Sequence, residues 1–299
     1  MTSPEEQRTA DAPGVGNPHR VLHWLQTSID GAVGPLAPRA ARLLAHDRSG
    51  ELTSGRLLVL APHPDDETLG CGLAVQRALG SGAKVLAVVA TDGRYGDPDV
   101  IPPERMAAIR LDELKAATSV LGLDPTDLLT LGFEDASLTR AESMLRGAVE
   151  EVVAGFLPDV VMSPCPWDLH PDHAALGRAA RVVLAGRPAQ HVEYLVWGWK
   201  QPVRLTGRLV RRLRHGQQGP MTAGRPALVD GSPYLAKKAQ ALACYASQFG
   251  PSAELHGRPI GGSGPLDNGF LRQFDFENEL FFPWLARKPT SPVPDRRTK

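Results

Sequence analysis

Two short segments, far apart in the chain, combine histidines with carboxylates at close spacing. His63 and Asp66 lie three positions apart in PHPDDE, and His170 and His173 lie three positions apart in HPDH. A spacing of three places two side chains on the same side of a helical turn. Crowded carboxylates repel each other and are costly to bury unless a positive charge lies among them. The pattern therefore indicates a bound metal ion.

A catalytic zinc site usually takes three protein ligands and leaves a fourth position open for water. Two ligands from one of these turns and one from the other supply such a set, for one zinc ion per chain. Iron(II) or manganese fits the same ligand types. The groups left over can do chemistry: Asp65 can accept a proton from water, and the remaining histidine of HPDH can stabilise an oxyanion or protonate a leaving amine. Together they describe the hydrolysis of an amide.

Both segments come directly after continuous apolar runs, residues 56–62 and 158–164, that are typical of strands buried on both faces. Further strands are expected at 83–91, 128–133 and 191–199, and helices at 68–79, 103–122, 140–156 and 173–186. This alternation predicts an α/β fold, a Rossmann-like, doubly wound and mostly parallel sheet with helices on both faces. Ligands of such sheets bind at the carboxyl ends of the strands, so the fold brings the two segments to one edge.

We expect a single domain over residues 50–287, of which 203–287 are a C-terminal extension. Residues 1–20 and 288–299 are predicted to be disordered tails. Within the extension, helices are expected at 232–248 and in the final stretch FDFENELFFPW. The arginine-rich stretch Arg204–Arg214 is either a solvated helix face or a contact for an anionic substrate or anionic lipid.

The composition excludes several classes of protein. The 299 residues carry 33 Lys plus Arg and 33 Asp plus Glu, and this balance argues against a nucleic-acid binder. The three cysteines form no CxxC pair and favour a reducing compartment, the cytoplasm. No stretch has the apolar length of a signal peptide core or a membrane span. An oligomer is compatible with the sequence.

The stretches PHPDDE and HPDH, in this order and on this fold, resemble the PIG-L/LmbE-like family of zinc-dependent de-N-acetylases. That family removes acetyl groups from N-acetylglucosamine-type sugars on lipids, thiol-cofactor precursors, antibiotics or polysaccharide intermediates. The resemblance implies that His63, Asp66 and His173 are the zinc ligands. It also implies that Asp65 is the general base and that His170 supports the oxyanion or the leaving group.

The resemblance covers residues 56–199 and extends to two substrate contacts. RLDELKAATSVLG matches a family helix whose Arg110 equivalent faces the sugar, and LGFEDASL matches a turn whose Asp135 equivalent binds sugar hydroxyls. One position departs from the pattern. Some relatives carry a tyrosine two residues before HPDH, where this chain has Asp168, so more of the oxyanion stabilisation is expected to fall to His170.

The sequence therefore predicts a zinc hydrolase that removes the N-acetyl group from an amino sugar. One alternative is a zinc amidase that cleaves a larger acyl or thiol conjugate at the same centre. A second is a non-catalytic metal- or ligand-binding module, although a binder has no need of the base or the extra imidazole. A nucleotide-binding protein is the weakest alternative, because PHPDDE occupies the place where pyrophosphate would lie.

Overall fold

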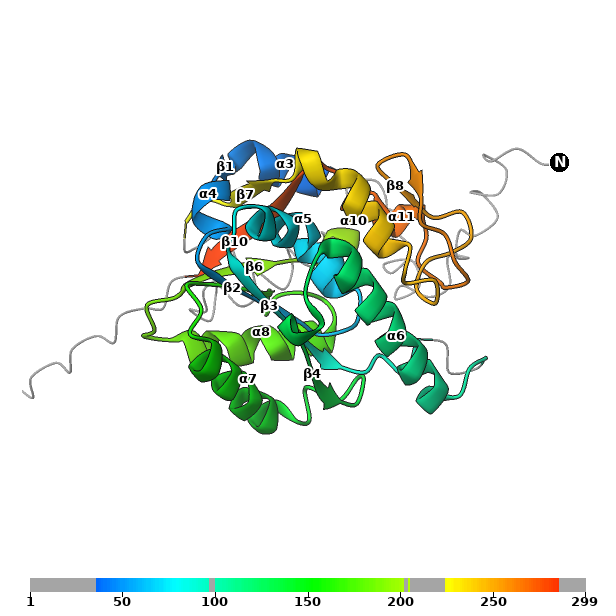
Figure 1. The fold of residues 1–299 in the computed structure, drawn as a ribbon, viewed down its shortest axis with the longest axis horizontal. Helices are drawn as coiled ribbons and strands as arrows, with labels where there is room; N and C mark the ends of the chain where they lie inside the picture. The colour runs from blue at the N-terminus through cyan, green and yellow to red at the C-terminus, as the bar shows by residue number, and fades with distance from the viewer. Residues whose placement is uncertain (1–35, 97–99, 202–203, 205–223, 285–299) are drawn as a thin grey trace, which may run out of the picture.

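The structure, a computed structural model, describes residues 36–96, 100–201, 204 and 224–284. Most of its strands form an eight-stranded sheet in the order β1-β7-β10-β6-β5-β2-β3-β4, and β8 and β9 form a separate hairpin (Figure 1). The strands are β1 (His46–Asp47), β2 (Arg56–Ala61), β3 (Lys84–Thr91), β4 (Leu128–Phe133), β5 (Val160–Pro164), β6 (Gln190–Tyr194), β7 (Ala227–Asp230), β8 (Glu254–Leu255), β9 (Arg258–Pro259) and β10 (Asn278–Trp284). In the large sheet only β10 runs against its neighbours. The predicted mostly parallel α/β sheet is confirmed.

The strand order reverses at β2, which pairs with β3 on one side and with β5 on the other. From β2 the chain winds outward through β3 to β4, and it then returns to place β5 and β6 on the opposite side. Such a reversal opens a crevice at the carboxyl ends of the central strands. PHPDDE leaves β2 at this end and HPDH comes after β5, so the topology brings the two segments together.

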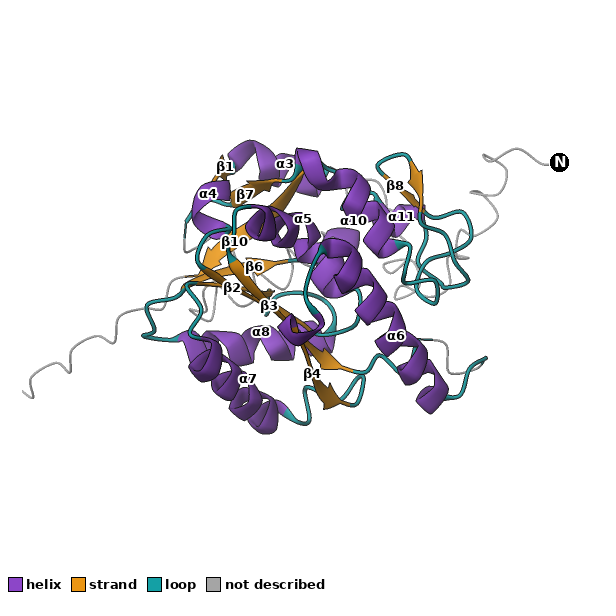
Figure 2. Cartoon of the chain, viewed as in Figure 1, coloured by secondary structure: helices purple, strands orange, loops and turns teal. Residues whose placement is uncertain are grey.

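Helices cover both faces of the sheet (Figure 2). They are α3 (Ala37–Leu44), α4 (Ser49–Leu52), α5 (Asp66–Gly80), α6 (Pro103–Leu121), α7 (Glu142–Phe156), α8 (Pro171–Leu184), α10 (Leu235–Leu242) and α11 (Asn268–Leu271). Successive residues of β2 point to opposite faces. Leu57 and Val59 pack in the apolar core formed with α5, α6 and α10, whereas Leu58 and Leu60 pack in the core formed with α7 and α8. The central strand is therefore buried on both faces, as its apolar run predicted.

The expected final helix is wrong, because FDFENELFFPW contains strand β10. This strand lies between β6 and β7 and is antiparallel to both. Its residues alternate between the faces: Phe281 belongs to the α5 side, while Leu280 and Phe282 pack in a cluster with Trp167 on the other side. Three bulky apolar residues in succession suit a strand buried on both faces better than a one-sided helix.

The C-terminal extension is built into the same fold. Lys238 on α10 and Glu279 on β10 form a buried ion pair at 2.7 Å. The Glu279 carboxylate also accepts the backbone N–H groups of Leu73 and Ala74, inside α5. The predicted helix at 232–248 is shorter than expected, since α10 ends at Leu242. The chain then turns, and residues 245–248 reach the carboxyl ends of the parallel strands.

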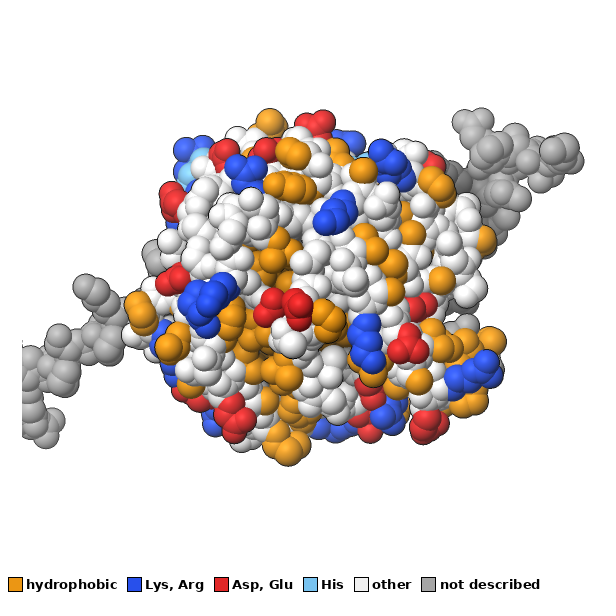
Figure 3. Space-filling view, in the orientation of Figure 1, with side chains coloured by type: hydrophobic (Ala, Val, Ile, Leu, Met, Phe, Trp, Pro, Cys, Tyr) orange, Lys and Arg blue, Asp and Glu red, His pale blue; other side chains and the backbone are white. Residues whose placement is uncertain are grey.

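The sheet also takes in residues before 50, where the domain was expected to begin, because β1 pairs with β7. The tails at 1–20 and 288–299, and the stretch Arg204–Arg214 apart from Arg204, lie outside the described residues. Basic and acidic side chains are interspersed on the face drawn in Figure 3. Within the described residues, no helix has the length and apolar character needed to cross a membrane.

Candidate active site

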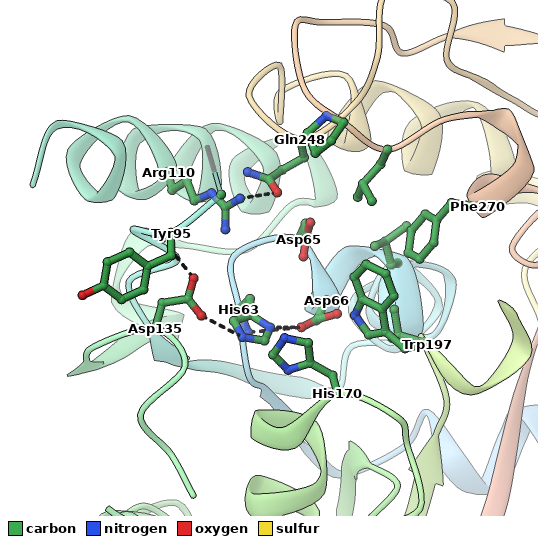
Figure 4. A pocket seen from close by; sticks show the side chains of 15 residues that line it. His63, Asp65, Asp66, Tyr95, Arg110, Asp135, His170, Trp197, Gln248 and Phe270 are labelled. Atoms are coloured by element: carbon green, nitrogen blue, oxygen red, sulfur yellow. Dashed lines mark hydrogen bonds and ion pairs between the residues drawn. The ribbon is translucent and has the colours of Figure 1, made fainter. Parts of the chain in front are cut away.

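A cavity of about 240 Å³ lies at the carboxyl ends of the parallel strands (Figure 4). Its lining comes from the turn after β2, the loops after β3, β4, β5 and β6, helix α6 and the C-terminal extension. The lining residues are His63, Asp65, Asp66, Leu69, Tyr95, Gly96, Arg110, Asp135, His170, Val196, Trp197, Gln248, Pro265, Leu266 and Phe270. Six of the seven predicted site residues line this cavity. The seventh, His173, is fully buried beside them.

The turn after β2 is held in an unusual conformation. Asp65 has a φ of 118°, which is uncommon for a residue other than glycine. The carboxylate of Glu67 accepts the backbone N–H of Asp65 at 3.0 Å, and the hydroxyl of Tyr245 donates to the same carboxylate. Glu67 is fully buried and does not line the cavity. Glu67 and Tyr245 therefore brace the turn that projects Asp65 into the cavity.

Asp66 lies between two of the predicted ligands. Its Oδ2 atom is 3.1 Å from Nδ1 of His63 and 3.1 Å from Nε2 of His173. Burial alone would raise the pKa of Asp66, but the two imidazoles hold it well below its usual value. The three residues are thus brought together from the turn after β2, the start of α5 and the first turn of α8.

The surroundings of His173 fit a metal ligand. Its Nδ1 is 3.1 Å from Oδ2 of Asp168, and this carboxylate also accepts the backbone N–H of Val196 at 2.9 Å. Its Nε2 is buried and makes no hydrogen bond, although Asp66 is close. A carboxylate on one imidazole nitrogen commonly orients the other toward a metal. Burial opposes protonation of His173, yet the two carboxylates raise its pKa to about 9, so this position favours a positive charge.

Donor atoms within 4.8 Å of one another form two groups in the described residues, and either could hold a metal ion. One is His63, His170 and His173, and the other is His63, Asp135 and Asp172. Both share His63 with the predicted set, and neither includes Asp66. The cluster therefore offers more donors than one ion requires, and all are nitrogen or oxygen atoms that suit zinc, iron(II) or manganese.

His170 is the imidazole of this cluster that is only partly buried. It caps the start of α8, where its Nδ1 accepts the backbone N–H of Asp172 at 3.3 Å. Its ring lies edge-on to His63, with centroids 4.7 Å apart. Burial and the neighbouring His63 and His173 lower its pKa to about 4. With Nδ1 accepting, a neutral His170 carries its proton on Nε2 and can donate it to a hydrogen bond.

Asp65 projects toward the space between the histidines and the Arg110 side of the cavity (Figure 4). Burial, with the charge of Asp66, raises its pKa well above the usual value. A carboxylate in this environment binds a proton more readily than one in water. The position of Asp65 and its raised pKa therefore suit a proton acceptor.

Two polar groups face the histidines from the other side of the cavity. Arg110 donates to Oε1 of Gln248 at 2.5 Å, and its Nε is buried without a partner. A Cβ atom at Gly96 would overlap the guanidinium of Arg110, so glycine lets the two approach closely. Asp135 has Oδ1 at 3.3 Å from Nε2 of His63. Burial opposes ionisation of Asp135, but the contact with His63 lowers its pKa to about 2.

The sequence interpretation missed several residues of the site. Asp168 was noted only as a departure from the tyrosine of some relatives, and the structure places it behind His173. Its position five residues before His173 was the available signal. Trp197 fell within an expected strand and belonged to no motif. Tyr245 and Gln248 come from the extension, where no local pattern points to the cavity.

Removing the Tyr245 hydroxyl tests the brace on the Asp65 turn. Tyr245→Phe leaves Glu67 without one donor, and we expect a loss of about 1–3 kcal/mol in the free energy of unfolding. Because the turn positions Asp65, kcat should fall several-fold while the metal content is unchanged. Urea unfolding, metal analysis and steady-state kinetics measure the three quantities. Tyr234→Phe, outside the cavity, is the matched control, and an unaltered kcat in Tyr245→Phe would contradict the brace.

Comparison with known proteins identifies relatives of this chain. The profile of a family described as PIG-L, GlcNAc-PI de-N-acetylase, matches residues 58–184. Diacetylchitobiose deacetylase of Thermococcus kodakarensis is 31% identical over 41% of this chain and 46% of its own. The match thus spans less than half of that relative. A probable N-acetyl-alpha-D-glucosaminyl L-malate deacetylase 2 of Bacillus anthracis is 31% identical over 64% of this chain and 81% of its own.

Solved structures share the fold. A deacetylase in complex with teicoplanin superposes with a TM-score of 0.52 at 17% identity, over 76% of this chain and 97% of that one. A deacetylase of an antimicrobial pseudoaglycone gives a TM-score of 0.50 at 21% identity, over 64% and 81% of the two chains. At these identities the likeness shows the fold alone.

Proposed function

Because the chain belongs to the PIG-L family, we propose that it is a metal-dependent hydrolase that removes the N-acetyl group from an N-acetylglucosamine-type sugar. One observation carries the proposal. The buried Nε2 of His173 has no hydrogen bond and lies beside Asp66 and His63, and Asp65 projects into the same cavity. A metal site next to a free carboxylate with a raised pKa is the arrangement that amide hydrolysis needs.

His63, Asp66 and His173 are the proposed ligands of one zinc ion per chain, with iron(II) or manganese as alternatives. When bound, the metal supplies Lewis-acid activation of water and of the amide carbonyl. Asp168 holds the imidazole of His173 in the orientation that binding requires. The three proposed ligands are themselves buried, and His63 and Asp66 also line the cavity.

The remaining groups move protons and stabilise charge. Asp65 accepts a proton from the attacking water through its carboxylate. His170, neutral at physiological pH, donates a hydrogen bond from Nε2 to the carbonyl oxygen as negative charge develops there. Protonation of the leaving amine then falls to Asp65, which has gained a proton, or to His170. Acetate and a free amino sugar are the products.

Arg110 and Asp135 are the proposed contacts for the sugar. Arg110 lines the cavity, and a guanidinium carries several N–H donors that sugar hydroxyls can accept. Asp135 is ionised and accepts hydrogen bonds from hydroxyls that reach its side of the cavity. The cytoplasmic location and the contact of Arg204–Arg214 with an anionic lipid or substrate stay predictions.

Arg110→Lys tests this contact. Lysine keeps the charge but loses the planar guanidinium and its bond to Gln248, so we expect KM to rise about tenfold with a smaller change in kcat. Steady-state acetate release measures both constants. Arg105→Lys, on an exposed part of the same helix, is the matched control. An unchanged KM with lowered stability would assign Arg110 a purely structural role.

Product analysis tests the reaction itself. A panel of N-acetylglucosamine derivatives and of amides with larger acyl groups is incubated with the zinc-loaded protein, and acetate and amine are quantified together. Equal amounts of acetate and free amino sugar support the deacetylase. Cleavage confined to the larger acyl conjugates identifies an amidase, and bound zinc without any cleavage identifies a binding module.

A further inference from the structure

The cavity has two chemically different walls. Figure 4 shows Arg110, Asp135 and Tyr95 on one side of the histidines and Trp197 and Phe270 on the other. The apolar wall is completed by Leu69, Val196 and Leu266. The rings of Trp197 and Phe270 are 5.0 Å apart between centroids, and Trp197 lies 6.1 Å from the ring of His170. An apolar surface therefore borders the position at which the amide would be cleaved.

This wall is larger than the proposed reaction requires. The acetyl group that leaves presents a single methyl to the protein. Phe270 is almost fully buried behind Trp197, whereas Trp197 itself keeps part of its surface open to the cavity. An indole face and a leucine side chain offer room for several carbon atoms. Apolar surface left open in a polar cavity commonly marks the place of an apolar ligand group.

The wall is held in place by backbone hydrogen bonds. Leu266 donates its N–H to the carbonyl of Gln248 at 2.9 Å, and its own carbonyl accepts the N–H of Gly250 at 2.8 Å. Asp267 caps helix α11 by accepting the N–H of Phe270 at 2.9 Å. Trp197, Leu266 and Phe270 all lie outside the segment 58–184 that the family profile matches. These backbone hydrogen bonds fix the position of Leu266 and Phe270, and Leu69 on α5 is the member of the wall that lies inside the matched segment.

We infer that the substrate is an N-acetylated amino sugar with an apolar alkyl or aryl aglycone, which lies along Trp197 and Leu266. The inference rests on the proposed function, because the sugar and its amide set the position of the aglycone. The sugar hydroxyls face Arg110 and Asp135 on the polar wall. The aglycone then removes the open part of Trp197 from water, which favours binding.

A series of methyl, propyl and hexyl glycosides of N-acetylglucosamine tests the inference. Each methylene buried on the wall is expected to raise kcat/KM about fourfold, from about 0.8 kcal/mol per methylene. Trp197→Ala and Leu266→Ala should flatten this dependence, so that kcat/KM for the hexyl glycoside falls toward the value for the methyl glycoside in the same variant. Trp197→Phe, which keeps an aromatic ring, should retain part of the chain-length dependence that Trp197→Ala loses. Trp284→Ala is the matched control and should keep the chain-length dependence, because Trp284 lies on β10, pairs with His191 at the start of β6 and does not line the cavity.

Calorimetric binding of the hexyl and methyl glycosides of glucosamine, the amine products, separates the two proposals. Hexyl glycoside that binds at least about tenfold tighter than methyl, with the difference lost in Trp197→Ala, supports the apolar subsite even if no acetate is released. Equal turnover and equal binding of both glycosides overturn the subsite and leave the deacetylase intact. A rate that rises with the length of the N-acyl chain instead overturns the aglycone assignment.

Discussion

Asp65→Asn is expected to lower kcat by about 10²- to 10⁴-fold, the range typical of a general acid–base group, and to leave the metal bound. Asp65 projects into the cavity, while the contacts among the histidines run through Asp66. Asparagine is also one of the residues that tolerate positive φ, so the turn at φ 118° should persist. Asp65→Ala should lose at least as much turnover and some stability besides.

The two readouts are turnover by acetate release and metal per chain by elemental analysis. Asp112→Asn, on the exposed side of helix α6, is the matched control and should change neither. Full turnover in Asp65→Asn would show that another group takes the proton. Loss of metal together with turnover would instead place Asp65 among the ligands.

His173→Ala is expected to abolish tight metal binding, and turnover with it. The imidazole is fully buried, its Nδ1 is held by Asp168, and its Nε2 faces Asp66 without a hydrogen bond. His173 is one of the three proposed ligands, so its removal leaves that set one donor short. Asp168→Asn should keep the ligand but weaken its orientation, and we expect metal affinity to fall about 10- to 100-fold.

Competition with a chelator of known affinity measures both effects. His191→Ala is the matched control, because His191 is also a buried histidine but bonds to Ser163 at 2.8 Å, away from the cluster. Its metal affinity should equal that of the parent protein. A His173→Ala variant that still binds zinc at the parent affinity would remove His173 from the ligand set and favour the oxygen donors Asp135 and Asp172 around His63.

The part of the site that could be predicted lies in segments whose position is set by local pattern and sheet topology. PHPDDE and HPDH each come after a strand that is apolar along most of its length, and parallel strands deliver the segments at their carboxyl ends to one edge. Arg110 and Asp135 likewise come from helix α6 and the loop after β4. The family resemblance named these two residues, and both line the cavity, while their contact with the sugar stays a prediction.

The rest depends on contacts between distant parts of the chain. Gln248 reaches Arg110, and Tyr245 reaches Glu67, only because α10 ends earlier than its sequence suggests. The strand β10 was mistaken for a helix because its apolar run is short and its neighbours in the sheet are not its neighbours in sequence. Pairing of this kind is decided by the assembled sheet and not by local propensity.

Restoration of acetate release by metal is the decisive measurement for a metal-dependent deacetylase. Protein stripped with a chelator, the same protein reloaded with one equivalent of zinc, and reloaded Asp65→Asn are assayed side by side on an N-acetylglucosamine glycoside. We expect no release after stripping, full release after zinc, and almost none from the reloaded variant. Release that continues at the parent rate in metal-free protein would show that the reaction does not depend on the metal.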